Sequence, residues 1–151
     1  MKPPHGAELA VGAVVVDGDR LLLVRRGRGA GAGRWAPPGG RVEAGEGPVA
    51  AVRREVAEET GLTVVVDALA GWVERRGTEP EPYEYLILDF FASPVGPTTL
   101  RAGDDAAEAR WVPLAEVAAL DLVDGLFDFL VGIGRLPGER REAGERNDGD
   151  N

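Results

Sequence analysis

The chain has 151 residues, of which 44% are hydrophobic and 28% charged, and this composition is ordinary for a single globular domain. Its net charge of −9 argues against binding to nucleic-acid polymers, which requires clustered Lys and Arg. The absence of cysteine excludes disulfides and thiol catalysis and fits a cytoplasmic protein. Because no apolar run reaches the roughly 18 residues of a membrane span, we expect no membrane association.

The N-terminal third of the chain predicts a β-hairpin followed by a loop. Residues 9–16 and 20–25 are apolar strands on either side of an Asp-Gly-Asp turn at 17–19, which is a strong hairpin signal. The glycine-rich segment 27–33 matches neither a P-loop nor a dinucleotide-binding pattern. We therefore interpret it as a flexible connector.

A helix is predicted from Pro48 to Thr60. Proline is favoured in a first helical turn, and Gly61 stands where a C-terminal cap is expected. Val49, Val52 and Val56 recur at spacings of three and four residues and predict a narrow buried stripe. The acidic residues of this helix lie mostly off that stripe, so the helix can present them to a cleft.

The rest of the chain alternates between strand and helix signals. We expect short strands at 64–67, 72–75 and 109–112, an exposed loop at 74–82, a central strand at 83–92, and helices at 114–120 and 122–136. This order predicts an α/β protein with a mixed sheet and helices packed on it. One domain spans residues 1–136, and the polar segment 137–151 is expected to be disordered.

Three glutamates on the predicted helix point to a metal site. Glu55, Glu58 and Glu59 fall within little more than one turn, directly after Arg54. Three carboxylates so close together repel one another unless a cation lies between them. Mg²⁺ prefers such oxygen ligands together with water and phosphate oxygens. The alternative interpretation is a solvated helix with salt bridges, which is the usual meaning of a charge run.

The region around these glutamates resembles the signature of the Nudix hydrolases, and no position within that signature departs from it. The matching residues are Gly40, Glu46, Arg54, Glu55, Val56, Glu58, Glu59, Gly61 and Leu62. The resemblance covers residues 9 to about 133 and implies an α/β/α sandwich with a mixed β-sheet. It also implies hydrolysis of a nucleoside diphosphate linked to another group X, with Mg²⁺ or Mn²⁺ as the cofactor.

The resemblance implies roles for individual residues. The metal ligands would be the Gly40 carbonyl and the carboxylates of Glu55, Glu58 and Glu59. Arg54 would orient a catalytic glutamate, while Glu46 and Gly61 would hold the motif in shape. The general base is either a glutamate of the motif, such as Glu58, or a later acid. Among the later acids we favour Glu108 over Asp104 and Asp105.

Other residues are candidates for binding the substrate. Arg25 and Arg26, at the end of a strand, either hold phosphate or are surface charges. Trp35 and Tyr85, and Tyr83 beside the latter, either stack on a base or pack against the protein. Each of these alternatives stays open at the level of sequence.

The substrate is less well defined than the reaction. We expect ADP-ribose or a related nucleoside diphosphate sugar. A MutT-type enzyme acting on an ordinary or oxidised nucleoside triphosphate is the alternative. A regulator that binds a nucleotide without cleaving it is the alternative of another class, although the intact signature favours an enzyme. Pairing of sheet edges would allow a homodimer.

Overall fold

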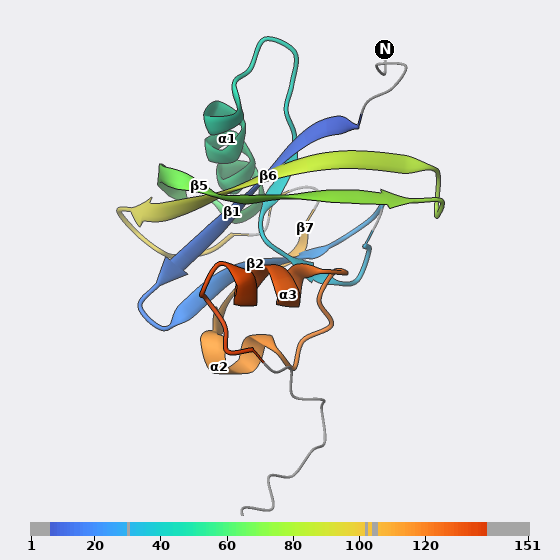
Figure 1. The fold of residues 1–151 in the computed structure, drawn as a ribbon. Helices are drawn as coiled ribbons and strands as arrows, with labels where there is room; N and C mark the ends of the chain where they lie inside the picture. Colours follow the sequence, from blue (N-terminus) through green and yellow to red (C-terminus); the bar gives the residue numbers. More distant parts are fainter. Residues whose placement is uncertain (1–6, 30, 102, 104–105, 139–151) are drawn as a thin grey trace, which may run out of the picture.

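The structure is a computed structural model that describes residues 7–29, 31–101, 103 and 106–138 (Figure 1). Its strands and helices have these bounds: β1 Glu8–Asp17, β2 Arg20–Arg26, β3 Trp35–Ala36, β4 Gly39–Arg41, α1 Pro48–Thr60, β5 Thr63–Gly77, β6 Tyr83–Val95, β7 Ala106–Pro113, α2 Leu114–Val117 and α3 Leu126–Gly132. Within these residues, no helix is long and apolar enough to cross a membrane.

The strands form one mixed sheet. Its main order is β3-β2-β1-β6-β5, with β4 added to β1 and β7 added to β2. β1 and β6 run parallel, whereas the other paired strands are antiparallel. Figure 1 shows α1 on one side of the sheet and α2 and α3 on the other. The predicted α/β architecture with a mixed sheet is therefore confirmed.

The core has two halves because side chains along a strand point alternately to the two faces of the sheet. Val11 and Val15 of β1 pack in the cluster that includes the buried residues of α1. Val14 belongs to the second cluster, which includes residues of α2 and α3. The continuous apolar run of β1 is thus explained by burial on both faces.

The hairpin of β1 and β2 opens away from its turn. Val16 pairs with Leu21 next to the predicted turn. Further along, Val11 of β1 pairs with Gly40 of β4, while Val24 of β2 pairs with Ala36 of β3. The two strands have therefore taken different partners by this point, and the space between them contributes to the cavity described below.

Two expectations about the strands need correction. The segments 64–67 and 72–75 belong to the single strand β5, whose register shifts between Val66 and Ala68 and again between Leu69 and Gly71. A β-bulge accommodates an extra residue within a strand, so the polar and glycine residues at these positions do not end β5 as the sequence suggested. The strand continues to Gly77, so the expected loop at 74–82 is confined to residues 78–82.

The helices also differ from the predicted bounds. α1 agrees with the prediction at both ends, but Val49 is 46% exposed, so the buried stripe consists of Val52 and Val56 with Ala51. α2 ends at Val117 and α3 covers only Leu126–Gly132. The segment before α3 is extended because the backbone of Trp35 bonds to residues 121 and 123. Most of the tail predicted at 137–151 lies outside the described residues.

Candidate active site

The ends of α1 fix where its glutamates lie. The helix begins at Pro48 and ends at Thr60. The capping residue Gly61 follows, with a left-handed φ of 77° and an N–H that donates to the Ala57 carbonyl at 3.0 Å. Val52 and Val56 are buried against the sheet. With both ends and the buried face fixed, the rotation of the helix about its axis is fixed as well.

Arg54 connects this helix to the loop before it. Its guanidinium donates to both carboxylate oxygens of Glu46 at 2.8 and 2.9 Å, and to the Arg41 carbonyl at 3.0 Å. It also donates to Glu55 at 2.8 Å and to Glu58 at 3.3 Å. The hydrogen bond from Arg54 is the main reason that the pKa of Glu46 is lowered. Arg54 and Glu46 therefore lie where a supporting role requires them.

Glu55 and Glu59 face each other, with Glu55 beside the backbone of Gly40 and Glu59 beside that of Gly39. A Cβ atom on Gly40 would come within 2.5 Å of a Glu55 carboxylate oxygen, so only glycine leaves this approach open. Burial, together with the hydrogen bond and negative charge of Glu55, raises the pKa of Glu59 to about 8. Two carboxylates in this arrangement share a proton unless a cation replaces it.

The donor set fits a hard divalent cation, although the described side chains are not gathered around one point. Within the described part of the chain, no three acidic or histidine side chains are close enough together to hold a metal ion as they stand. Glu55 and Glu59 line the cavity, whereas the side chain of Glu58 is 59% exposed and bonded to Arg54. Oxygen donors of this kind suit Mg²⁺ or Mn²⁺.

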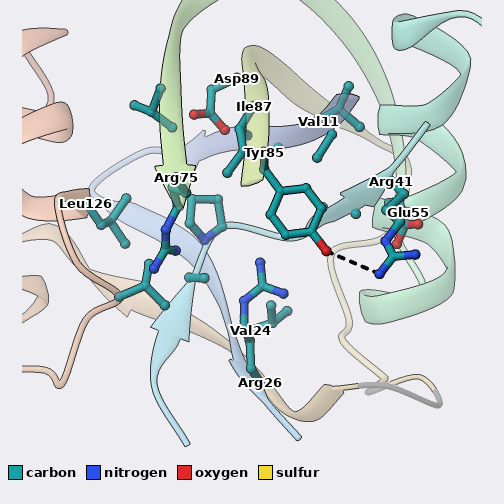
Figure 2. A pocket seen from close by; sticks show the side chains of 18 of the residues that line it. Val11, Val24, Arg26, Arg41, Glu55, Arg75, Tyr85, Ile87, Asp89 and Leu126 are labelled. Atoms are coloured by element: carbon teal, nitrogen blue, oxygen red, sulfur yellow. Dashed lines mark hydrogen bonds between the residues drawn. The ribbon is translucent and has the colours of Figure 1, made fainter. Parts of the chain in front are cut away.

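A cavity of about 680 Å³ begins at this pair of glutamates (Figure 2). It is large enough for a nucleotide-sized ligand. Strands β1, β5 and β6 form one wall, and β2 with the segment around α3 forms the other. The residues from these two walls include Ala10, Gly12, Val73, Arg75, Tyr83, Tyr85, Ile87 and Asp89, and, opposite, Val24, Arg26, Val123, Leu126 and Phe129.

Two arginines bring positive charge into the cavity. Arg26 and Arg75 both line it and are close enough for each to influence the other. Burial lowers the pKa of Arg26, with Glu59 opposing that effect. The Nε atom of Arg26 is buried and has no hydrogen-bond partner among the described residues. The sequence identified Arg26 as a candidate but not Arg75, which lies where the expected strand 72–75 overlaps the expected loop 74–82.

Arg25 and Trp35 do not lie where a substrate contact requires them. Neither residue lines the cavity. Arg25 is adjacent to Arg26 on a strand and lies opposite Glu108 of β7, with which it forms an ion pair of 3.7 Å. Trp35 is only 7% exposed and belongs to the core, and the Arg110 guanidinium stacks over its ring at 4.7 Å. The position of these two residues therefore gives no support to a contact with the substrate.

The acids proposed from the later part of the chain receive no support as general bases. Glu108 bonds to Arg110 at 2.9 Å and does not line the cavity. Its partner across the sheet is Arg25, with which its carboxylate forms an ion pair of 3.7 Å. The preference for Glu108 therefore stays a prediction without support from this geometry. Asp104 and Asp105 lie outside the described residues.

Tyr85 does line the cavity, and Figure 2 shows its hydroxyl accepting a hydrogen bond from Arg41 at 3.2 Å. It stacks on Tyr83, with ring centroids 5.9 Å apart. Asp89 lies four residues further along β6 and was missed by sequence reasoning. The signal was present, because Tyr83, Tyr85 and Asp89 have the even spacing of one strand face.

Comparison with known proteins gives a consistent result. The NUDIX domain family model matches residues 6–131. A protein of Methanocaldococcus jannaschii named ADP-ribose pyrophosphatase is 36% identical over 112 residues, which are 74% of this chain and 65% of that protein. A MutT-like protein of Streptomyces ambofaciens is 36% identical over 130 residues, covering 82% of this chain and 79% of that protein.

A solved structure agrees with the sequence matches. The MutT protein from Methanosarcina mazei Go1 superimposes with a TM-score of 0.75 and 28% identity, covering 89% of this chain and 97% of that one. The family match spans most of the chain and includes the helix, the Arg54 network and the glutamates Glu55 and Glu59. The chain therefore belongs to the Nudix family of hydrolases.

Proposed function

We propose that the protein is a metal-dependent pyrophosphohydrolase that cleaves the diphosphate of ADP-ribose or a related nucleoside diphosphate sugar. The observation that carries this proposal is the pair Glu55 and Glu59, which face each other on the wall of a nucleotide-sized cavity. The cavity also receives Arg26 and Arg75, whose positive charge suits a diphosphate.

The proposed metal ligands are the Gly40 backbone and the carboxylates of Glu55, Glu58 and Glu59. Mg²⁺ or Mn²⁺ bound there would acidify a water molecule and screen the negative charge of the diphosphate. Glu59 must release its proton for this, and a cation there would relieve the repulsion between Glu59 and Glu55.

The remaining residues orient the carboxylates, bind the phosphate or accept a proton. Arg54 holds Glu55 and Glu58 to the loop through Glu46, so the carboxylates keep their direction. Arg26, whose buried Nε has no partner in the described part of the chain, would bind a phosphate oxygen. The acceptor of the proton from the attacking water would be a glutamate of the helix, such as Glu58.

ADP-ribose comes first among the substrates because the relative from M. jannaschii carries the name of an ADP-ribose pyrophosphatase. Hydrolysis of a nucleoside triphosphate is the second candidate, and the MutT-like relative supports it. A nucleotide-binding regulator without catalysis is the third, although the complete glutamate set argues against it.

The test is a panel of ADP-ribose, UDP-glucose, GDP-mannose, dGTP and oxidised dGTP incubated with Mg²⁺ and the purified chain. We expect AMP and ribose 5-phosphate from ADP-ribose at a higher kcat/KM than for any triphosphate. A higher kcat/KM for a triphosphate would overturn the proposed substrate. Binding of panel members without turnover of any of them would overturn the proposal that the protein is an enzyme.

A further inference from the structure

We propose that the Asp89 carboxyl group binds the nucleobase of the substrate and that this base is an adenine. The inference rests on the proposed function, since it takes the cavity to be the site of a nucleoside diphosphate derivative. It adds a binding role for Asp89, which lies on the sheet rather than in the helix that carries the glutamates.

Asp89 is a buried carboxyl group without a partner. It is only 6% exposed, and no described residue donates a hydrogen bond to its side chain or forms an ion pair with it. It nevertheless lines the cavity, in which Figure 2 shows it on the same wall as Ile87 and Tyr85. Buried polar groups are almost always hydrogen-bonded, so an unpartnered one that faces a cavity indicates a ligand.

Both strand neighbours of Asp89 are glycines, which carry no side chain. Asp89 pairs with Gly12 of β1 on one side and with Gly71 of β5 on the other. A Cβ atom on Gly12 would collide with the Asp89 carboxylate, and one on Gly71 would lie 3.0 Å from the ring of Phe129. These glycines therefore leave room for the carboxyl group above one strand and for an aromatic ring above the other.

The other side chains near this end of the cavity suit a planar base. Ile87 and Val73 extend from the sheet, and Val123, Leu126 and Phe129 come from the opposite wall. Apolar and aromatic walls with a small number of polar groups are typical of a site for a heterocycle. Asp89 would supply the hydrogen bonds that orient such a ring.

The spacing between Asp89 and the glutamates suits one nucleotide. Gly12 pairs with Asp89 on one side and with Gly39 of β4 on the other. Asp89 and Gly39 are therefore two strand spacings apart, about 10 Å. The Gly39 N–H points toward Glu59 at 3.4 Å. A base held by Asp89 would thus place its phosphates near Glu59.

Adenine is the base of the proposed substrate, and the surroundings of Asp89 suit it. Asp89 is 6% exposed and pairs with no arginine or lysine among the described residues, so its place favours the neutral carboxyl group. Burial raises the pKa of Asp89 to about 7. A protonated carboxyl group offers one donor and one acceptor, as an Asn side chain does, and this pair matches the ring nitrogen and amino group of adenine. Guanine presents two donors on its Watson–Crick edge and would suit a carboxylate instead.

The experiment is calorimetric titration of the full chain at pH 6 with AMP, GMP and ribose 5-phosphate, the last as a probe without a base. We expect AMP to bind more tightly than GMP. Asp89→Asn should retain the affinity for AMP, whereas Asp89→Leu should lower that affinity roughly ten- to hundredfold. Ribose 5-phosphate should bind all three proteins equally. Asp67→Asn is the matched control, because Asp67 is exposed on β5 outside the cavity.

The inference is overturned if Asp89→Leu keeps the affinity for AMP, or if it lowers the affinity for ribose 5-phosphate as much as that for AMP. It is also overturned if the wild type binds GMP more tightly than AMP. The outcome is separable from that of the proposed function. If the protein cleaves ADP-ribose and its affinity for AMP does not change when Asp89 is substituted, the base site is refuted and the proposed function stands. Binding of AMP that depends on Asp89, in a protein that cleaves nothing, supports the base site and refutes the enzyme.

Discussion

Two carboxyl groups of the cavity are held in surroundings that favour their protonated forms. Burial raises the pKa of Asp89 to about 7, and burial together with Glu55 raises that of Glu59 to about 8. In each case the fold accepts a group that would be more stable in water. Such destabilised groups are typical of functional sites, where a ligand restores the missing interaction.

The pKa of Asp89 predicts how stability depends on pH. In the unfolded chain this proton leaves near the ordinary value of 3.8, and in the folded protein near 7. Between these values the folded state holds more protons, so stability falls as pH rises. The contribution of Asp89 to this loss reaches up to roughly 4 kcal/mol by pH 8. Its neighbours across the sheet, Gly12 and Gly71, carry no charge that would offset it.

Asp89→Asn isolates this effect because the amide does not titrate. Urea denaturation without metal, at intervals from pH 5 to pH 8, should show the variant gaining stability relative to wild type as pH rises. Glu59 titrates in both proteins and cancels in the comparison. Parallel curves for the two proteins would show that the Asp89 pKa is close to its ordinary value.

At the scale of elements, α1 and the loop before it act as one unit. Arg54 makes five hydrogen bonds: two to Glu46 of the loop, one to the end of β4, and two to acids of its own helix. Because the guanidinium is planar and forked, it can serve both Glu46 oxygens while reaching Glu55. A lysine has the same charge and lacks this geometry.

We therefore expect Arg54→Lys to lower kcat by about ten- to hundredfold, since the carboxylates lose their orientation while charge is kept. Steady-state kinetics on the best substrate of the panel measures the loss. Arg53→Lys is the control, because Arg53 is exposed on the same helix. Equal activity of the two variants would contradict a role for Arg54 in positioning.

The end of α1 gives a second prediction at this scale. Gly61 has a φ of 77°, and an added Cβ would meet only ordinary contacts, the nearest being Arg101 at 3.5 Å. Gly61→Ala should therefore destabilise the protein by backbone strain alone, about 1–2 kcal/mol. Thermal unfolding measures this loss, and turnover per folded molecule should be unchanged. A large fall in kcat at full folding would show that Gly61 does more than end the helix.

For the whole molecule, local sequence patterns predicted the strands and helices, whereas contacts between segments far apart in the chain form the cavity. The hairpin at 17–19 and the bounds of α1 follow from turn and cap residues close in sequence. The cavity joins β1, β2, β5, β6 and the segment around α3, and no short-range pattern reports that meeting. The even spacing of Tyr83, Tyr85 and Asp89 indicates a shared strand face, but the sequence does not show that Arg75 and Asp89 meet in one cavity.

Two candidate residues fall outside the cavity for the same reason. Trp35 could have stacked on a base, but the chain after α2 returns to bond with its backbone and the ring enters the core. Glu108 could have faced the water that attacks phosphate, but pairing of β7 with β2 sets it against Arg25. Both outcomes depend on strand pairing between segments far apart in the chain.

The central claim is that Glu55 and Glu59 make this chain a metal-dependent hydrolase. It is tested most directly by following ADP-ribose hydrolysis during a Mg²⁺ titration of wild type, Glu59→Gln and Glu116→Gln, the last an exposed glutamate of α2 outside the cavity. The account predicts no turnover without metal, normal activity for Glu116→Gln, and a loss of at least about a hundredfold for Glu59→Gln at an unchanged fold. Turnover without added metal after chelation, or near-normal activity of Glu59→Gln, would contradict it.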